Sequence, residues 1–165
     1  MDQTASHRLL VETNNALVQE LKGTIERMQD IEVELGDVQM ALKEDHEEVE
    51  TYTDDIADCC DRINAIDEFV RDIEAGNVPA MADVASVLSN MAEEREEEEA
   101  MLKRLGEVRA CHEQQIQQMS IKLTTLQEEK LMLQKKSAQI WCVLGRTGVF
   151  ELAMRRLTLR IPKTV

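Results

Sequence analysis

Four cysteines and three histidines are the side chains best suited to bind a transition metal or to act as nucleophiles. Zinc sites and redox-active disulfides usually place two cysteines in a C-x-x-C spacing, and this spacing is absent among Cys59, Cys60, Cys111 and Cys142. In the hairpin inferred below, Cys59 lies about 17 residues, or roughly 25 Å, from Cys111 and His112 along the helices. These ligands cannot share one ion, so we predict no metal and no cofactor.

The sequence also lacks the motifs of catalytic sites. It has no glycine-rich phosphate loop, no nucleophile elbow, and no serine or cysteine placed with a histidine and a carboxylate. The many glutamates are expected to be solvated, and a pair of long helices has no concavity that would exclude water from a reaction. We therefore predict that the protein is not an enzyme and has no small-molecule substrate.

The composition indicates which elements carry these side chains. Hydrophobic residues make up 43% of the chain but aromatic residues only 2%, so Leu, Ile, Val, Met and Ala must form the core. Six glycines and two prolines are too few for the turns of a β-sandwich, a barrel or a series of βα units. With 33 acidic and 19 basic side chains, the net charge of −14 argues against nucleic-acid binding. An all-α protein is expected.

Two breaks divide the chain. Residues 75–79 read Ala-Gly-Asn-Val-Pro, where glycine suits a helix end and proline an early position of the next helix. Residues 144–148 contain two glycines and form the second break. We predict a first helix over 1–75, a turn over 76–83, a second helix over 84–145 and a tail over 146–165.

Both predicted helices carry a heptad seam, that is, a line of positions alternately three and four residues apart. The first seam runs from residue 10 to residue 73, and sixteen of its nineteen positions are apolar. The second runs from residue 84 to residue 144, with twelve of eighteen positions apolar. This spacing is typical of a coiled coil. We therefore expect a long antiparallel two-helix coiled-coil hairpin followed by a short C-terminal docking segment.

The charged seam residues suggest a register for the two helices. If facing residue numbers add to 154, every seam position from 10 to 70 meets another seam position, and 13 residues remain to close the end. This register places Asp45 opposite Arg109, so that two opposite charges satisfy each other within the seam. We predict Asp45 and Arg109 as the register pair.

A partner face is predicted near the turn. Residues 93–99 are six glutamates and one arginine, and they run through the seam of the second helix at 95 and 98. In the predicted register they face Ile56 and Cys59, with Ile63 at the edge. One explanation is a solvated helical face. The other is that a helix from another chain covers Ile56, Cys59 and Ile63.

A second partner face is predicted at the open end of the hairpin. There the apolar stripe widens beyond what two strands can bury, through Val11, Val18, Ile25 and Trp141. The tail is the nearest element that could cover it, and it combines apolar and basic side chains. Its predicted interface residues are Phe150, Leu152, Arg155, Arg156, Leu157, Leu159, Arg160 and Ile161. Folding back onto the hairpin and docking on another protein both remain open.

We expect a structural subunit of a large intracellular assembly, with other coiled-coil subunits as partners. A cytoskeletal setting (ciliary, axonemal, centriolar or kinetochore) is favoured because long acidic coiled coils are frequent there. The alternative is an adaptor whose tail captures an acidic partner such as tubulin, since residues 146–165 hold five basic side chains and one acidic one. Free thiols, no apolar run of membrane-spanning length and no export signal predict a cytoplasmic location without a membrane partner.

Overall fold

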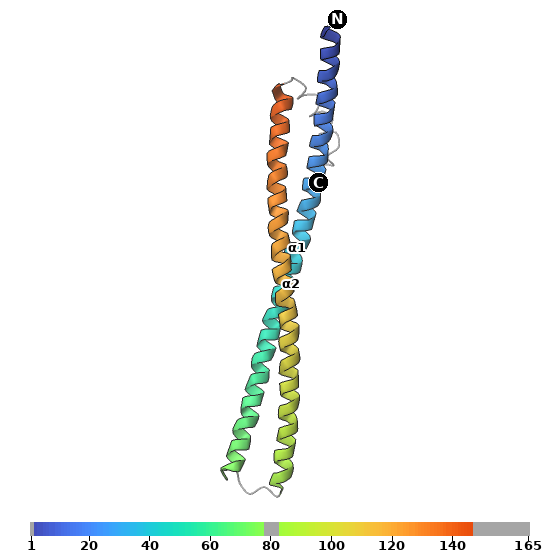
Figure 1. Ribbon diagram of the computed structural model, residues 1–165. Coiled ribbons are helices and arrows are strands. Elements are labelled where there is room, and N and C mark those ends of the chain that lie inside the picture. The colour runs from blue at the N-terminus through green and yellow to red at the C-terminus, as the bar shows by residue number, and fades with distance from the viewer. Residues whose placement is uncertain (1, 78–82, 147–165) are drawn as a thin grey trace, which may run out of the picture. The chain divides into compact units, whose positions relative to one another are not determined.

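Two long helices account for nearly all of the described chain. The computed structural model describes residues 2–77 and 83–146, with α1 at Asp2–Glu74 and α2 at Val84–Arg146. The chain reverses after α1, so that α2 returns antiparallel beside it (Figure 1). The predicted all-α antiparallel hairpin is therefore confirmed. The tail residues predicted to dock, from Phe150 to Ile161, lie outside the described residues, and so does Pro79.

The end of α1 and the start of α2 are both capped. Gly76 has a φ of 72°, and its N–H donates to the Ile73 carbonyl while the Asn77 N–H donates to the Asp72 carbonyl, each at 3.0 Å. This is a Schellman motif, in which glycine takes the left-handed conformation that other residues avoid. At the start of α2, the Asp83 Oδ1 accepts a 3.1 Å hydrogen bond from the Ser86 N–H as an N-cap.

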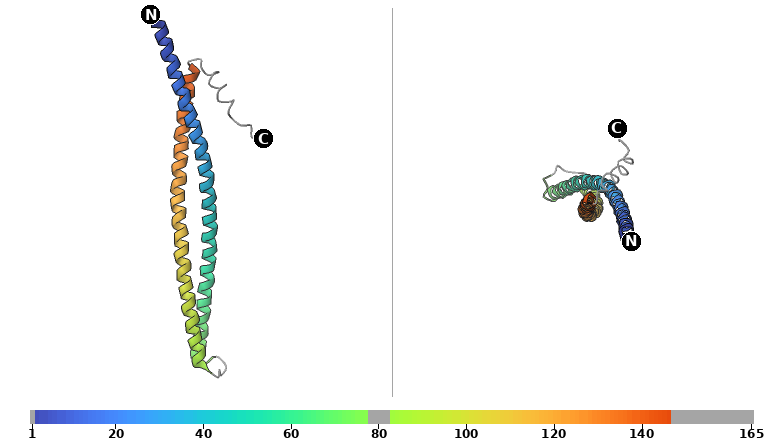
Figure 2. Two further views of the ribbon diagram at one scale, coloured as in Figure 1. Left: turned by 90° about the vertical axis from the view of Figure 1, so that its right-hand side faces the viewer. Right: turned by 90° about the horizontal axis from the view of Figure 1, so that it is seen from above.

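The heptad seam predicted from the sequence is the contact surface of the two helices. Every predicted seam position from Asn14 to Ile73 in α1 and from Leu88 to Leu144 in α2 is buried or half-buried. Only the outermost positions, Leu10 and Val84, are exposed, at 48% and 42%. Figure 2 shows the helices from two further directions.

The chain divides into two compact units. We call residues 40–120 the turn unit, and the described residues up to Gln39 and from Ile121 onward the terminal unit. The terminal unit contains most of the buried apolar side chains, including a cluster of Leu21, Ile140 and Leu144. Leu17 and Trp141 are among the half-buried side chains that pack against this cluster.

Two polar seam residues are buried in the terminal unit. Asn14 and Thr24 are each 5% exposed. The Thr24 hydroxyl donates a 2.8 Å hydrogen bond to the Glu20 carbonyl within α1, which satisfies its buried donor. Thr24 can therefore occupy a seam position without a polar partner on α2.

Ion pairs between the helices flank the seam of the terminal unit. The Arg27 guanidinium binds both carboxylate oxygens of Glu129, with distances of 2.8 and 3.0 Å. This contact lowers the pKa of the Glu129 carboxyl. Two lysine pairs, Lys136 with Glu20 at 2.8 Å and Lys130 with Glu32 at 3.0 Å, add further cross-helix contacts.

Candidate partner-binding surface

The seam of the turn unit is only partly covered by its two helices. Cys59 is the one fully buried side chain among residues 40–120 whose burial is described, whereas the terminal unit has several. The apolar seam residues that are only half-buried are Leu42, Val49, Tyr52, Ile56, Ile63, Ile66, Val70 and Ile73 on α1, and Leu88, Met91, Leu102, Leu105, Ile116 and Met119 on α2. Two helices alone leave part of this seam in contact with water.

The acidic stretch of α2 contributes Glu98 to the seam, where it meets α1 directly. The Cys59 thiol donates a 3.0 Å hydrogen bond to Glu98 Oε2, and Arg62 donates two bonds to the same carboxylate, at 2.7 and 3.0 Å. Arg62 holds the pKa of the Glu98 carboxyl below its ordinary value, and the thiol adds to this effect. In return, the carboxylate and burial raise the pKa of the Cys59 thiol.

Arg95, the other charged seam residue of this stretch, is also paired. It donates a 2.7 Å hydrogen bond to Asp67 of α1 and so lowers the pKa of that carboxyl. Its second contact is an ion pair with Glu99 in α2. The charges at positions 95 and 98 are therefore satisfied between α1 and α2, not left against an apolar face.

These contacts change one part of the predicted partner face. Cys59 has no exposed surface, and the contact expected from another chain is made instead by Glu98 of the same chain. Ile56 and Ile63 are half-buried, so part of each side chain stays accessible to a further helix. Their contact with a partner stays a prediction.

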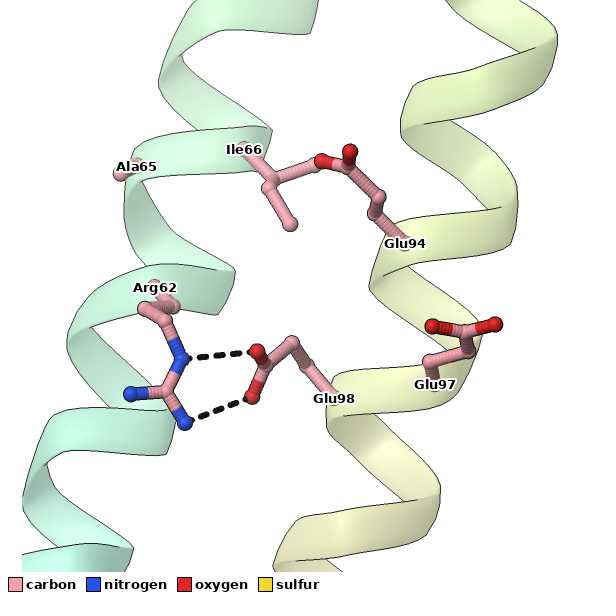
Figure 3. A pocket seen from close by; sticks show the side chains of 6 residues that line it. All are labelled: Arg62, Ala65, Ile66, Glu94, Glu97 and Glu98. Atoms are coloured by element: carbon pink, nitrogen blue, oxygen red, sulfur yellow. Dashed lines mark hydrogen bonds and ion pairs between the residues drawn. The ribbon is translucent and has the colours of Figure 1, made fainter.

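An open groove lies between the two helices beside the contact of Arg62 with Glu98. It has a volume of about 300 Å³ and is lined by Arg62, Ala65, Ile66, Glu94, Glu97 and Glu98. Figure 3 shows Arg62 and Glu98 meeting across the groove, with the Glu94 side chain extending toward Ile66. The heptad pattern does not predict this groove, although alanine and glutamate beside the seam are sequence signals of a shallow, acidic rim.

The predicted register pair is wrong. Asp45 Oδ1 lies 2.7 Å from Nδ1 of His112, three residues beyond Arg109. Arg109 instead donates a 3.1 Å hydrogen bond to Glu113 in its own helix. The Tyr52 ring stacks on His112 with a centroid distance of 5.6 Å, which completes a polar and aromatic contact between the helices.

The widened stripe at the open end is present in part. Val18, Ile25 and Trp141 are half-buried and pack against the buried cluster of the terminal unit. Val11 remains 45% exposed. The prediction that a third element covers this stripe involves tail residues outside the described part of the chain.

Formal charge is divided very unevenly between the two parts of the sequence. Residues 40–120 contain 22 acidic and 7 basic side chains, a net charge of −15, whereas the rest of the sequence contains 11 and 12, a net charge of +1. The acidity of this protein is therefore a property of the turn unit.

Within residues 2–77 and 83–146, no group of three or more His, Cys, Asp or Glu side chains is placed to hold a metal ion. Neither of the two described helices is long and apolar enough to cross a membrane. Comparison with protein-family models, curated proteins and solved structures finds no match to this chain. Its function must be argued from its own surface.

Proposed function

We propose that this protein is a non-catalytic coiled-coil subunit of a larger protein assembly, and that a helix of another subunit packs on the turn unit. The observation that carries this proposal is the seam of residues 40–120, whose apolar side chains are nearly all only half-buried by α1 and α2. Exposed apolar surface in a continuous stripe is costly in water and marks interaction sites in many proteins. A third helix along the stripe would complete the burial that α1 and α2 begin.

We propose a cytoskeletal assembly on the basis of chain composition and helix length. Helices of 73 and 63 residues and a net charge of −14 are typical of long intracellular coiled coils. This cytoskeletal setting stays a prediction, as does the alternative of an adaptor that captures an acidic partner through residues 146–165.

The experiment compares two double variants of the tagged full chain, purified from the cells that naturally make it. Ile56→Asp with Ile63→Asp places two charges on the half-exposed seam. Ala57→Asp with Asn64→Asp is the matched control, because each substitution lies one residue further along α1 at an exposed position. Circular dichroism verifies that both variants keep their helix content.

We expect the seam variant to lose specific subunits that co-purify with the wild-type chain and with the control. If the seam variant keeps its helix content and its co-purifying subunits, the turn-unit seam is a solvated face and the proposal fails. The same conclusion follows if the control loses the same subunits, since charge anywhere on α1 would then be sufficient.

A further inference from the structure

Two exposed apolar side chains of α2 lie on the same side of the helix as Glu94, which lines the groove. Glu94, Met101 and Val108 are seven residues apart, so they follow one another on the same side of the helix. Met101 is 46% exposed and Val108 is 40% exposed. A helix lying beside α2 with apolar residues at the same spacing would cover both side chains.

The rim of the groove on α2 is acidic, and its carboxylates have no ion-pair partner among residues 2–77 and 83–146. Glu94 and Glu97 line the groove, and neither forms an ion pair with any described residue. Arg62, the basic side chain among the residues that line the groove, is already engaged with Glu98. The rim therefore favours a positively charged ligand.

Charge also argues against a second copy of this chain as the occupant. Two turn units would each bring a net charge of −15 to the interface, and like charges repel. A partner with basic side chains instead gains attraction over the whole surface and associates faster through electrostatic steering.

We propose that the turn unit binds an amphipathic helix whose apolar stripe is flanked by lysine or arginine. The apolar stripe packs on Ile66, Met101 and Val108, and the basic flank meets Glu94 and Glu97. This inference rests on the proposed function, because it specifies the chemistry of the helix that packs on the turn unit.

Three fluorescent peptides of about 20 residues, long enough for nearly three heptads, test this proposal against the full chain by anisotropy titration. The first has Leu and Ile in a heptad stripe with Lys flanks. The second keeps that stripe but has Glu flanks. The third has the composition of the first with its apolar residues scattered around the helix. We expect the first to bind about tenfold more tightly than either other peptide, and its binding to weaken as salt increases.

Matched variants locate the site. Glu94→Lys with Glu97→Lys should weaken binding of the first peptide about tenfold, because two attractive contacts become repulsive. Asp30→Lys with Asp37→Lys adds the same charge at exposed positions of the terminal unit and should leave binding within about twofold, because no contact of the site is touched. Ala65→Trp should block the groove while leaving the seam side chains in place.

Several outcomes would overturn the proposal. If the scattered peptide binds as tightly as the first peptide, charge alone is recognised. If the variant of Asp30 and Asp37 weakens binding as much as the variant of Glu94 and Glu97, no particular site is used. Binding that begins only after residues 147–165 are deleted would identify the chain's own tail as the occupant. A dimer of the full chain that Ala65→Trp makes monomeric would identify a second copy.

Failure of this inference and failure of the proposed function give different results. If the peptides show no preference but Ile56→Asp with Ile63→Asp still removes native subunits, the seam binds a partner that is not a basic helix. If the seam variant retains all subunits, the proposed function itself is wrong.

Discussion

His112 Nδ1 lies 2.7 Å from Asp45 Oδ1, so two polar seam residues on opposite helices satisfy each other inside the turn unit. The Asp45 and His112 side chains are only 15% and 24% exposed. A half-buried polar contact of this kind favours one register, because a shift of either helix would separate the two groups.

A double-mutant cycle should detect this pairing. We expect Asp45→Ala and His112→Ala to be coupled by about 0.5 to 1.5 kcal/mol in urea unfolding, the range for one hydrogen bond. The cycle of Asp45→Ala with Arg109→Ala serves as the control and should show coupling near zero. A larger coupling with Arg109 than with His112 would return the hairpin to the register predicted from the sequence.

The contact between Asp45 and His112 shows which features of the hairpin the sequence predicts and which it does not. Heptad spacing predicts both helices and nearly all seam positions, because an apolar line every three to four residues has one way to be buried. The register is less determined, since moving one seam by seven residues pairs seam positions equally well. Matching by formal charge pairs Asp45 with Arg109, whereas the structure pairs Asp45 with His112, three residues further along α2.

The sequence predicts only part of the candidate partner-binding surface, because this surface depends on how closely the two helices approach. The acidic run of α2 indicated a special face, but the pairing of Glu98 with Arg62 depends on a side chain beside the seam of α1. How much of Ile56 and Ile63 stays exposed depends on how closely the two helices approach, which spacing alone does not encode. The groove beside Ile66 follows from the same geometry.

Acid should remove the contribution of the Arg62–Glu98 pair to stability. Folding lowers the pKa of Glu98 below its ordinary value of 4.5, chiefly through the hydrogen bonds from Arg62. Such a carboxylate stabilises the folded chain above the ordinary pKa, and this contribution is lost as the pH falls through the lower folded value. Melting temperatures of the wild type should therefore fall more steeply below pH 4.5 than those of Glu98→Gln.

The control for the acid experiment is Glu97→Gln, at an exposed position one residue earlier in α2 that forms no ion pair with the described residues. It should follow the wild type as the pH falls. Identical profiles for Glu98→Gln and the wild type would show that the Arg62–Glu98 contact does not form in solution.

Two glycines of the turn unit should respond to alanine with opposite signs. Gly76 has a φ of 72°, which costs an L-residue roughly 1 to 2 kcal/mol, so Gly76→Ala should destabilise the hairpin by about that amount. Gly106 lies within α2, where alanine is favoured over glycine by about 0.5 to 1 kcal/mol. A new Cβ meets no atom within 4 Å at either site, so backbone conformation alone sets both effects. Urea unfolding of both variants measures them, and equal signs would contradict the Schellman geometry.

Stability should also differ between the two units, and hydrogen exchange followed by mass spectrometry can measure it. The terminal unit has Leu21 and Leu144 fully buried, whereas Ile56 and Leu105 in the turn unit stay half-exposed among side chains that carry a net charge of −15. We expect slower exchange around Leu21 than around Ile56, because more apolar surface is removed from water there.

Salt shortens the Debye length from about 10 Å at 0.1 M to about 3 Å at 1 M. Because this weakens the repulsion among the acidic side chains, salt should slow exchange in the turn unit more than in the terminal unit. The basic helical peptide should also slow exchange in the turn unit, since it neutralises Glu94 and Glu97 and packs on Met101 and Val108. Uniform exchange along the chain, or an equal effect of salt on the two units, would mean that neither the half-exposed seam nor its charge limits the stability of the turn unit.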